Sequence, residues 1–121
     1  MAITKVRFEP GTHIPAKAGA DLTAGQLVVV TAGGINPTVG AATAGSVPLG
    51  VVAHDAKSGE LVTVLRGSVV AQVKSTGAIA VGANVAAGAA GAVVSAPADT
   101  AVIGTAVEAA ANNLVYVAFK L

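Results

Sequence analysis

Short apolar runs rich in Val alternate with turn residues along most of the chain. Gly, Pro, Asn or Ser interrupts these runs every eight to twelve residues, and a helical spacing of apolar positions is hard to find. This pattern is typical of an all-β sandwich or small barrel. It predicts strands over residues 27–31, 34–38, 49–53, 60–65, 68–73, 84–87, 92–95, 102–107 and 113–121.

Two of these segments, 61–66 and 114–121, alternate cleanly between two faces. In the second, one face carries Val115, Val117 and Phe119, and the other carries Tyr116 and Lys120. Both faces of these strands are partly apolar, so we expect the strands to lie between packed layers. The segments 31–34 and 87–91 predict hairpin turns.

The chain contains a degenerate internal duplication. Gly25 and Gly34 recur 57 residues later, residues 49–53 recur 54 residues later, and residues 59–64 recur 53 residues later. Two copies, roughly 25–74 and 82–121, can close a small barrel whose edges pair with each other.

The match of Gly59 with Asn112 has a physical reason, because both residue types tolerate the left-handed conformation of a tight turn. Chance similarity in a chain so rich in Ala, Val and Gly is the alternative interpretation.

The first twenty residues differ from the rest of the chain. They are dense in charge and contain the breakers Pro10, Gly11 and Pro15. We predict an extended N-terminal arm over residues 1–20 and one β-barrel-like domain over residues 21–121. Such an arm can be poorly ordered alone and can add a strand to a partner's sheet. A frayed terminus without function is the alternative.

Composition narrows the functional classes. The chain has 121 residues, of which 64 are Ala, Val or Gly; charged residues are 11%, aromatic residues 2%, and the net charge is +1. These values exclude a disordered polar tail, a coiled coil and a nucleic-acid binder that relies on basic patches. Small side chains bury little apolar area, so we expect a homo-oligomer.

No membrane partner is expected. The first ten residues lack the apolar region of a signal peptide. Between Lys74 and Asp99 lie 24 uncharged residues, but repeated Gly, Ser, Asn and Pro in this stretch favour short strands over a membrane helix.

The search for chemistry predicts no enzyme, no metal and no cofactor. The phosphate-loop, HExxH and GxSxG motifs are absent, and so is Cys. His13 and His54 would need a third metal ligand from Asp21, Asp55, Asp99 or a Glu, without supportive spacing. His54 and Asp55 beside Ser58 resemble a catalytic arrangement only superficially, because adjacent loop residues rarely face one another.

Lys57 raises an alternative from another class. It lies in a turn between two predicted strands, much as a lipoyl- or biotinyl-carrier domain presents its modified lysine. The surrounding His54-Asp55-Ala56-Lys57-Ser58 lacks the Asp-Lys or Met-Lys pair of those domains. An exposed lysine that only adds charge is the simpler interpretation.

Three segments together resemble the small capsid cement, or head-decoration, proteins of tailed phages. Residues 48–67 carry a hydrophobic-Gly-hydrophobic-Ala strand, a turn and a Val-x-Val strand that ends in Gly. Residues 69–85 are similar to a Lys-x-x-Gly-x-Ile-x-x-Gly-x-x-Val segment, and residues 103–121 to the final repeat. Val73 and Ala86 depart from the Pro and the aromatic residue that are frequent at these places.

The resemblance implies a virion protein, made in the host cytoplasm, that binds the outer surface of the phage head at threefold positions and stabilises the shell. Its partners would be the major capsid protein and two further copies of itself. We expect capsid contact at the arm residues Ile3, Lys5, Val6, Arg7 and Phe8. Another phage structural module, a head fibre or a tail accessory, is the alternative, ahead of the carrier domain.

Overall fold

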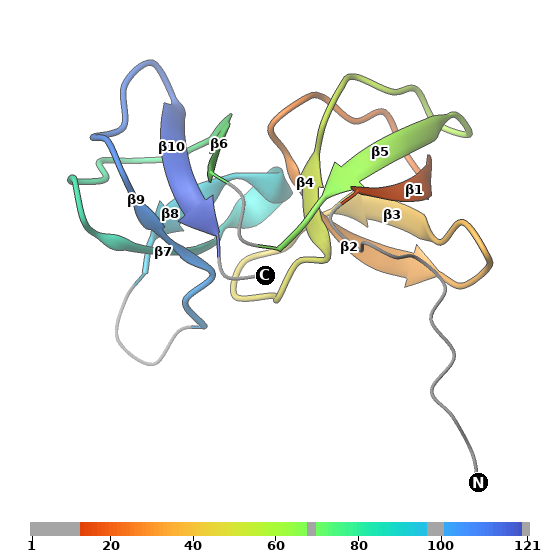
Figure 1. Cartoon of the computed structure of the whole chain (residues 1–121), viewed down its shortest axis with the longest axis horizontal. Coiled ribbons are helices and arrows are strands. Elements are labelled where there is room, and N and C mark those ends of the chain that lie inside the picture. The colour runs from red at the N-terminus through yellow and green to blue at the C-terminus, as the bar shows by residue number, and fades with distance from the viewer. Residues whose placement is uncertain (1–12, 68–69, 97–100, 120–121) are drawn as a thin grey trace, which may run out of the picture.

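The computed structural model describes residues 13–67, 70–96 and 101–119 and shows an almost entirely β molecule (Figure 1). The prediction of an all-β fold is confirmed. The described residues form the following strands and one short 3-10 helix: β1 (His13–Ala18), β2 (Leu27–Ala32), β3 (Thr38–Ala41), β4 (Gly50–Val52), β5 (Leu61–Leu65), β6 (Val70–Lys74), β7 (Asn84–Ala87), η1 (Ala89–Gly91), β8 (Val93–Ser95), β9 (Gly104–Ala106) and β10 (Leu114–Phe119).

The first half of the chain is a closed five-stranded barrel with the order β1-β3-β2-β4-β5. β1 closes it, pairing parallel with β3 and antiparallel with β5. Along β1 and β5 every second residue is buried, so one face of each strand fills the barrel and the other faces outward. The inner residues are small or β-branched, which fits the narrow interior of a five-stranded barrel.

The second half repeats this arrangement. Its sheet has the order β6-β10-β9-β7-β8. Replacing each strand of the closed barrel by the strand five places later, and reading that ring from β6 in the opposite direction, gives the same order. A parallel bridge between Ser75 and Val93 links β6 to β8. The N–H of Thr76 donates to the Val93 carbonyl at 2.9 Å, just as the N–H of Gly19 donates to Val39 at 2.9 Å in the first barrel.

The registers confirm the internal duplication and its spacings. In the first copy Leu27 is opposite Val51, and 57 and 54 residues later Asn84 is opposite Thr105. Gly59 and Asn112 also adopt the expected left-handed conformation, with φ of 90° and 54°. The similarity of the halves is therefore structural. The expectation that the two copies close one barrel together is wrong, because the first copy closes a barrel by itself and the second forms a sheet of its own.

The N-terminal boundary needs correction. Residues 13–18, which we had placed in the arm, are the barrel strand β1, and β6 is their counterpart in the second copy. Ile14, Ala16 and Ala18 are buried. Pro15 does not break the strand. The N–H groups of Lys17 and Gly19, two and four residues later, donate to Pro37 and Val39 and therefore point away from β5. An N–H at position 15 would point to the same side, so its absence removes no hydrogen bond between β1 and β5. Residues 1–12 lie outside the described residues.

The strand expected over residues 34–38 is also displaced. The structure has β3 at Thr38–Ala41, and residues 33–37 are the loop that precedes it. The hairpin turn expected over residues 31–34 lies later, because Thr31 and Ala32 belong to β2. Asn36 and Pro37 lengthen the loop, and Gly40 is tolerated inside the strand. In the shorter second hairpin, η1 occupies the predicted turn at residues 87–91.

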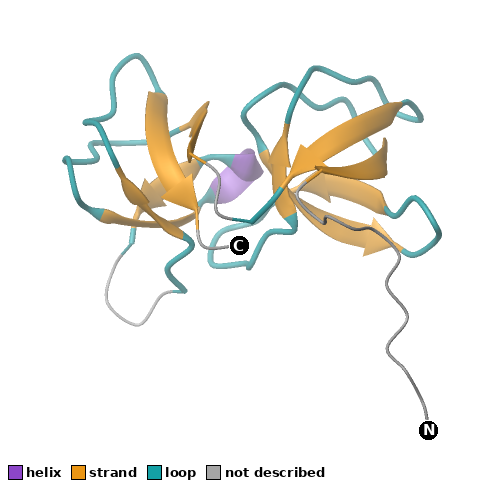
Figure 2. Ribbon diagram, in the orientation of Figure 1, coloured by secondary structure: helices purple, strands orange, loops and turns teal. Residues whose placement is uncertain are grey.

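The two copies share a hydrophobic core. Leu27, Ala42 and Val51 of the first barrel pack with the buried side chains of the second sheet. Backbone hydrogen bonds reinforce this junction: Gly91 N–H donates to Ala42 at 2.9 Å and Lys74 N–H donates to Gly25 at 3.0 Å. Figure 2 shows η1 between the two sheets, where it joins the hairpin of the second copy to the first barrel.

The uncharged stretch after Lys74 forms β7, η1 and β8, as the Gly-rich turns predicted. In the described part of the chain there is no helix of the length and apolarity that crossing a membrane requires.

Candidate interaction surface

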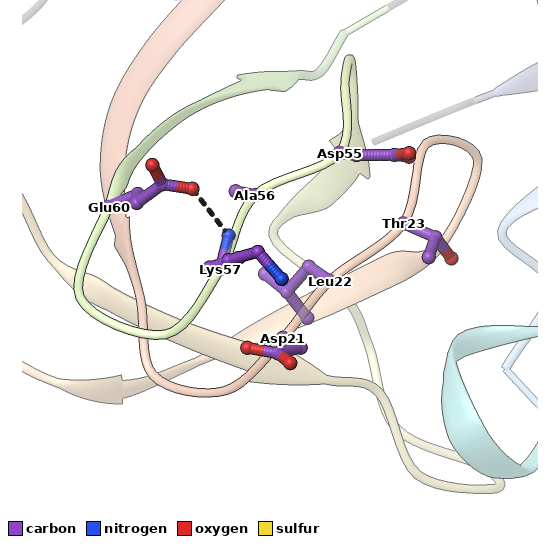
Figure 3. Close-up of a pocket in the computed structure, with 7 residues that line it drawn as sticks. All are labelled: Asp21, Leu22, Thr23, Asp55, Ala56, Lys57 and Glu60. Carbon is purple, nitrogen blue, oxygen red and sulfur yellow. Dashed lines mark hydrogen bonds between the residues drawn. The ribbon is translucent and has the colours of Figure 1, made fainter.

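The side chains that suggested acid–base chemistry hold the backbone instead. Figure 3 shows the loop pocket, which we define as the shallow pocket of about 400 Å³ around Asp21, Asp55, Lys57 and Glu60. Asp21 Oδ1 accepts the N–H of Ser58 at 2.9 Å, and Asp55 Oδ1 accepts the N–H of Ala24 at 2.8 Å. Both carboxylates therefore join the loop after β1 to the loop after β4.

His54 is engaged on both ring nitrogens. Its Nε2 accepts the N–H of Thr63 at 3.3 Å, and its Nδ1 lies 3.0 Å from the carbonyl oxygen of Asp55. Nε2 can accept this bond only in the tautomer that carries its proton on Nδ1, and in that tautomer Nδ1 donates to the Asp55 carbonyl. Ser58 Oγ faces the carbonyl of Gly19 at 3.5 Å rather than His54.

The structure also places the remaining candidates for metal and carrier chemistry. Among the described residues there is no group of three or more His, Asp or Glu side chains that could hold a metal; Asp99 lies outside them. Lys57 lies in the turn between β4 and β5, and its own N–H donates to Glu60 Oε1 at 2.7 Å (Figure 3). The side chain is exposed, as expected for a lysine of a turn.

An apolar patch covers the outward side of the second sheet. We call it the outer β10 face; its large exposed side chains are Val70, Val107, Leu114 and Tyr116. Their backbone positions are adjacent, because Val107 N–H donates to the Tyr116 carbonyl at 3.0 Å and Val70 is paired with Ala118 on the same side. Val70 is 63% exposed and Tyr116 is 41% exposed.

The sequence predicted part of this face. The alternation along residues 114–121 correctly placed Tyr116 opposite Val115 and Val117, which are buried. The contributions of β6 and of Val107, the residue after β9, were missed, because only the strand order brings Val107 opposite Tyr116 and Val70 diagonally next to it. Large apolar side chains gathered on one exposed surface mark an interaction site.

A second pocket lies where the two copies meet. The junction pocket, of about 670 Å³, is lined by Gln26 of the first copy and by residues 74–76, 89, 90, 92 and 112–114 of the second. Gln26 Nε2 donates to the Ala90 carbonyl at 3.1 Å, which fixes the left-handed residue Ala90 (φ 55°) against the first barrel.

Ser75 is the unusual residue of the junction pocket. It is only 5% exposed, and its hydroxyl has no hydrogen-bond partner in the described structure. Burying a hydroxyl without a partner costs about 1–3 kcal/mol. The corresponding residue of the first copy is Ala18, so the fold itself does not require a hydroxyl at this position.

The predicted capsid-contact residues Ile3, Lys5, Val6, Arg7 and Phe8 lie outside the described residues. Their role stays a prediction.

Comparisons with known proteins point to one class. No curated protein matched the chain. Among solved structures, the chain is similar to the N base of the head fibre protein gp8.5 of bacteriophage phi29, with 26% identity and a TM-score of 0.77. The alignment covers 89% of this chain and 92% of that one.

A family model described as phage cement protein matches residues 8–121, which include all described strands of both copies. The capsid cement resemblance is thus confirmed at the level of the family, and a structural role takes precedence over the carrier interpretation of Lys57. The chain belongs to the phage cement protein family and is a structural protein of the phage head.

Proposed function

We propose that this protein is a capsid decoration protein: made in the host cytoplasm, it binds the outer surface of the head at threefold positions as a homotrimer and stabilises the shell. The observation that carries the proposal is the outer β10 face, an apolar sheet surface left exposed in a member of the phage cement family. A protein that functions by binding other subunits is expected to expose such a face.

The outer β10 face is the proposed contact between copies. Contacts between identical subunits are more apolar than other interfaces, and aromatic residues are enriched at their centres. Tyr116 lies between Val107 on one side and Gln72 of β6 on the other, and the charged residue of this face, Lys74, is paired with Leu114 at its end.

The N-terminal residues are the proposed contact with the major capsid protein. Ile3, Val6 and Phe8 would supply apolar burial, and Lys5 and Arg7 would pair with acidic groups of the shell. Three such arms in one trimer would bind neighbouring capsid subunits together, because the second and third contacts form at high effective concentration. Many weak contacts would then resist outward pressure on the shell.

The direct test adds purified protein to heads that lack it and measures occupancy by imaging and shell stability by heating. We expect density at threefold positions and a higher temperature of shell rupture. A chain that lacks residues 1–10 should leave heads bare, whereas its fold, which starts at β1, should be retained. Unchanged occupancy of the shortened chain would remove the arm from the proposal.

The contact between copies is tested separately by light scattering. The wild-type protein should scatter as three 11.5-kDa chains, in solution or on release from heads. Tyr116→Ser should shift the protein toward the monomer, while Val47→Ser, at a 69% exposed valine in the loop between β3 and β4, should not. A trimer that tolerates Tyr116→Ser would mean that another surface joins the copies.

A head-fibre base is the second candidate, favoured by the similarity to the phi29 head fibre N base. The two functions differ in what the head displays. Imaging of decorated heads distinguishes them: a compact trimeric knob supports decoration, and a fibre projecting from the same density supports the base of a fibre.

A further inference from the structure

The polar groups of the two pockets differ in one respect. In the loop pocket the three carboxylates already accept backbone N–H groups. In the junction pocket, the side chains of Lys74, Ser75, Thr76, Asn112 and Asn113 have no hydrogen-bond or ion-pair partner within the described chain. The carboxylates of the first pocket are thus satisfied within the protein, whereas the second pocket presents donors without a partner among the described residues.

The duplication supplies an internal reference for this pocket. The registers place Ser75, Thr76, Asn112 and Asn113 at the positions of Ala18, Gly19, Gly59 and Glu60 in the first copy. The same backbone therefore forms with three residues that have no polar side chain, Ala18, Gly19 and Gly59, and with a glutamate in place of Asn113. The left-handed φ of Asn112 and Asn113, 54° and 60°, accounts for the two amides, because Asn tolerates this conformation. Folding does not require the Ser75 and Thr76 hydroxyls, and a ligand would explain a donor at this place.

Charge indicates what that ligand is. The junction pocket is lined by one cation, Lys74, and by hydroxyl and amide groups, and no carboxylate lines it. Lys74 is half-buried, whereas its counterpart Lys17 is exposed. An ammonium group beside neutral donors suits one anionic group with several acceptor positions, and a carboxylate has two oxygens and about four such positions.

We propose that the junction pocket binds the carboxylate of a Glu or Asp side chain from a protein partner. Lys74 pairs with the carboxylate, and the Thr76 hydroxyl and the Asn112 amide donate to its oxygens. A single cation is too little for a polyanion such as DNA, and the pocket has no aromatic side chain on which a sugar ring would stack. The site is formed where the two copies of the repeat meet. The proposal of a carboxylate site does not depend on whether the protein decorates heads.

The test is an NMR titration of the complete chain with the peptide acetyl-Ala-Glu-Ala-amide and, as its neutral match, acetyl-Ala-Gln-Ala-amide. We expect the glutamate peptide to shift the backbone amides of residues 74–76 and 112–114, with weak affinity on the order of 1 mM. The glutamine peptide should shift them at least tenfold less at equal concentration. Equal responses to the two peptides, or no response, would overturn the proposal.

Variants locate the site. Lys74→Met should lower the affinity by about tenfold or more, because it removes a charge-assisted bond. Lys17→Met, at the equivalent lysine of the first copy, should leave it unchanged; equal losses in both variants would overturn the proposal. Asn112→Gly retains the positive φ that the turn needs and should lower the affinity several-fold, which keeps the test valid if Lys74→Met fails to fold.

Glucuronate serves as the third probe, because it carries the same carboxylate on a sugar. Weaker binding of glucuronate than of the glutamate peptide supports a protein partner, and tighter binding would overturn that assignment. No heads are present in these measurements, so a failure here leaves the proposed decoration function untouched.

Discussion

Asp21 and Asp55 occupy reciprocal positions on the two sides of one backbone bridge. Leu22 and Ala56 exchange N–H···O hydrogen bonds of 2.8 and 2.9 Å, and each is directly preceded by one of the two aspartates. Each carboxylate accepts, at 2.9 and 2.8 Å respectively, the N–H that lies two residues beyond the bridge on the opposite loop. The four bonds lock the loop after β1 to the loop after β4.

Removing either carboxylate should weaken this lock. We expect Asp21→Ala and Asp55→Ala each to lower the free energy of unfolding by about 1 kcal/mol, the typical value of one net hydrogen bond. Urea unfolding measures it. Glu108→Ala is the matched control, since Glu108 is exposed and has no hydrogen bond within the described residues; it should change the stability by less than about 0.5 kcal/mol.

The two losses should not add in the double variant. Both aspartates support the same bridge, so the second substitution acts on a loop pair that is already loosened. The second copy shows that the bridge position survives without carboxylates: Ala110 N–H donates to Ile79 at 3.0 Å, with Ala78 and Ala109 in place of the aspartates. Strict additivity would mean that the aspartates act on independent parts of the loops.

Much of the fold was predictable because small-residue strands separated by turn residues leave a clear pattern. The spacings of 57, 54 and 53 residues identified equivalent positions in the two copies, and the strand pairings of both copies agree with them. The match of Gly59 with Asn112 located an equivalent turn in both copies. The alternation in β10 separated its buried face from its exposed face.

The parts of the fold and of the pockets that the sequence did not predict depend on contacts between residues far apart in the chain. β1 was missed because its charges and Pro15 resembled those of a free arm, although Ile14, Ala16 and Ala18 alternate as in any half-buried strand. The junction pocket combines segments from residue 26 to residue 114, which only the docking of the two copies brings together. In the sequence, the one signal of this pocket was the polar Ser75 at the position where the first copy has Ala18. That comparison is possible only when the first copy is taken to begin at β1.

Two equivalent glycines, Gly50 and Gly104, permit a close approach of strands. A Cβ on Gly50 would lie 2.8 Å from Val64 Cγ1 and would clash with the Leu65 carbonyl, and a Cβ on Gly104 would lie 2.6 Å from the Ala118 carbonyl oxygen. Because backbone atoms cannot move aside freely, we expect each Gly→Ala variant to lose about 1–3 kcal/mol or more.

The control for these variants is Gly33→Ala, where a Cβ would meet nothing within 4 Å. It should be neutral or slightly stabilising, because alanine restricts the unfolded chain. Thermal unfolding of the three variants gives the comparison. A Gly50→Ala protein as stable as Gly33→Ala would contradict the close packing of β4 against β5.

The buried Ser75 hydroxyl predicts a gain of stability upon its removal. Ser75→Ala should raise the free energy of unfolding by about 1 kcal/mol, since the side chain that remains is the one that the first copy has at this position. The reverse exchange, Ala18→Ser, should lower it by about 1–3 kcal/mol, because that hydroxyl would be buried in the first barrel. Two variants that both destabilise would show that Ser75 has a partner inside the protein.

The contact between the two copies makes Gly91 more sensitive than other left-handed glycines. Gly91 and Gly82 have nearly the same φ, 77° and 80°, so alanine suffers similar backbone strain at both. A Cβ on Gly91 would also lie 2.8 Å from the Leu27 carbonyl oxygen, whereas a Cβ on Gly82 would meet nothing within 4 Å.

Gly82→Ala should therefore lose about 1–2 kcal/mol, the cost of a left-handed alanine, and Gly91→Ala should lose more. The additional loss measures how strongly η1 is held against the first barrel, because the clash is with Leu27 of that barrel and the N–H of Gly91 donates to Ala42 there. Urea unfolding followed by a second, independent probe distinguishes two cases. If Gly91→Ala unfolds in a single transition at lower urea concentration, the two copies unfold together. If it unfolds in two separate transitions, the substitution has uncoupled the copies, and the shared core around Leu27 is what joins them in the wild type.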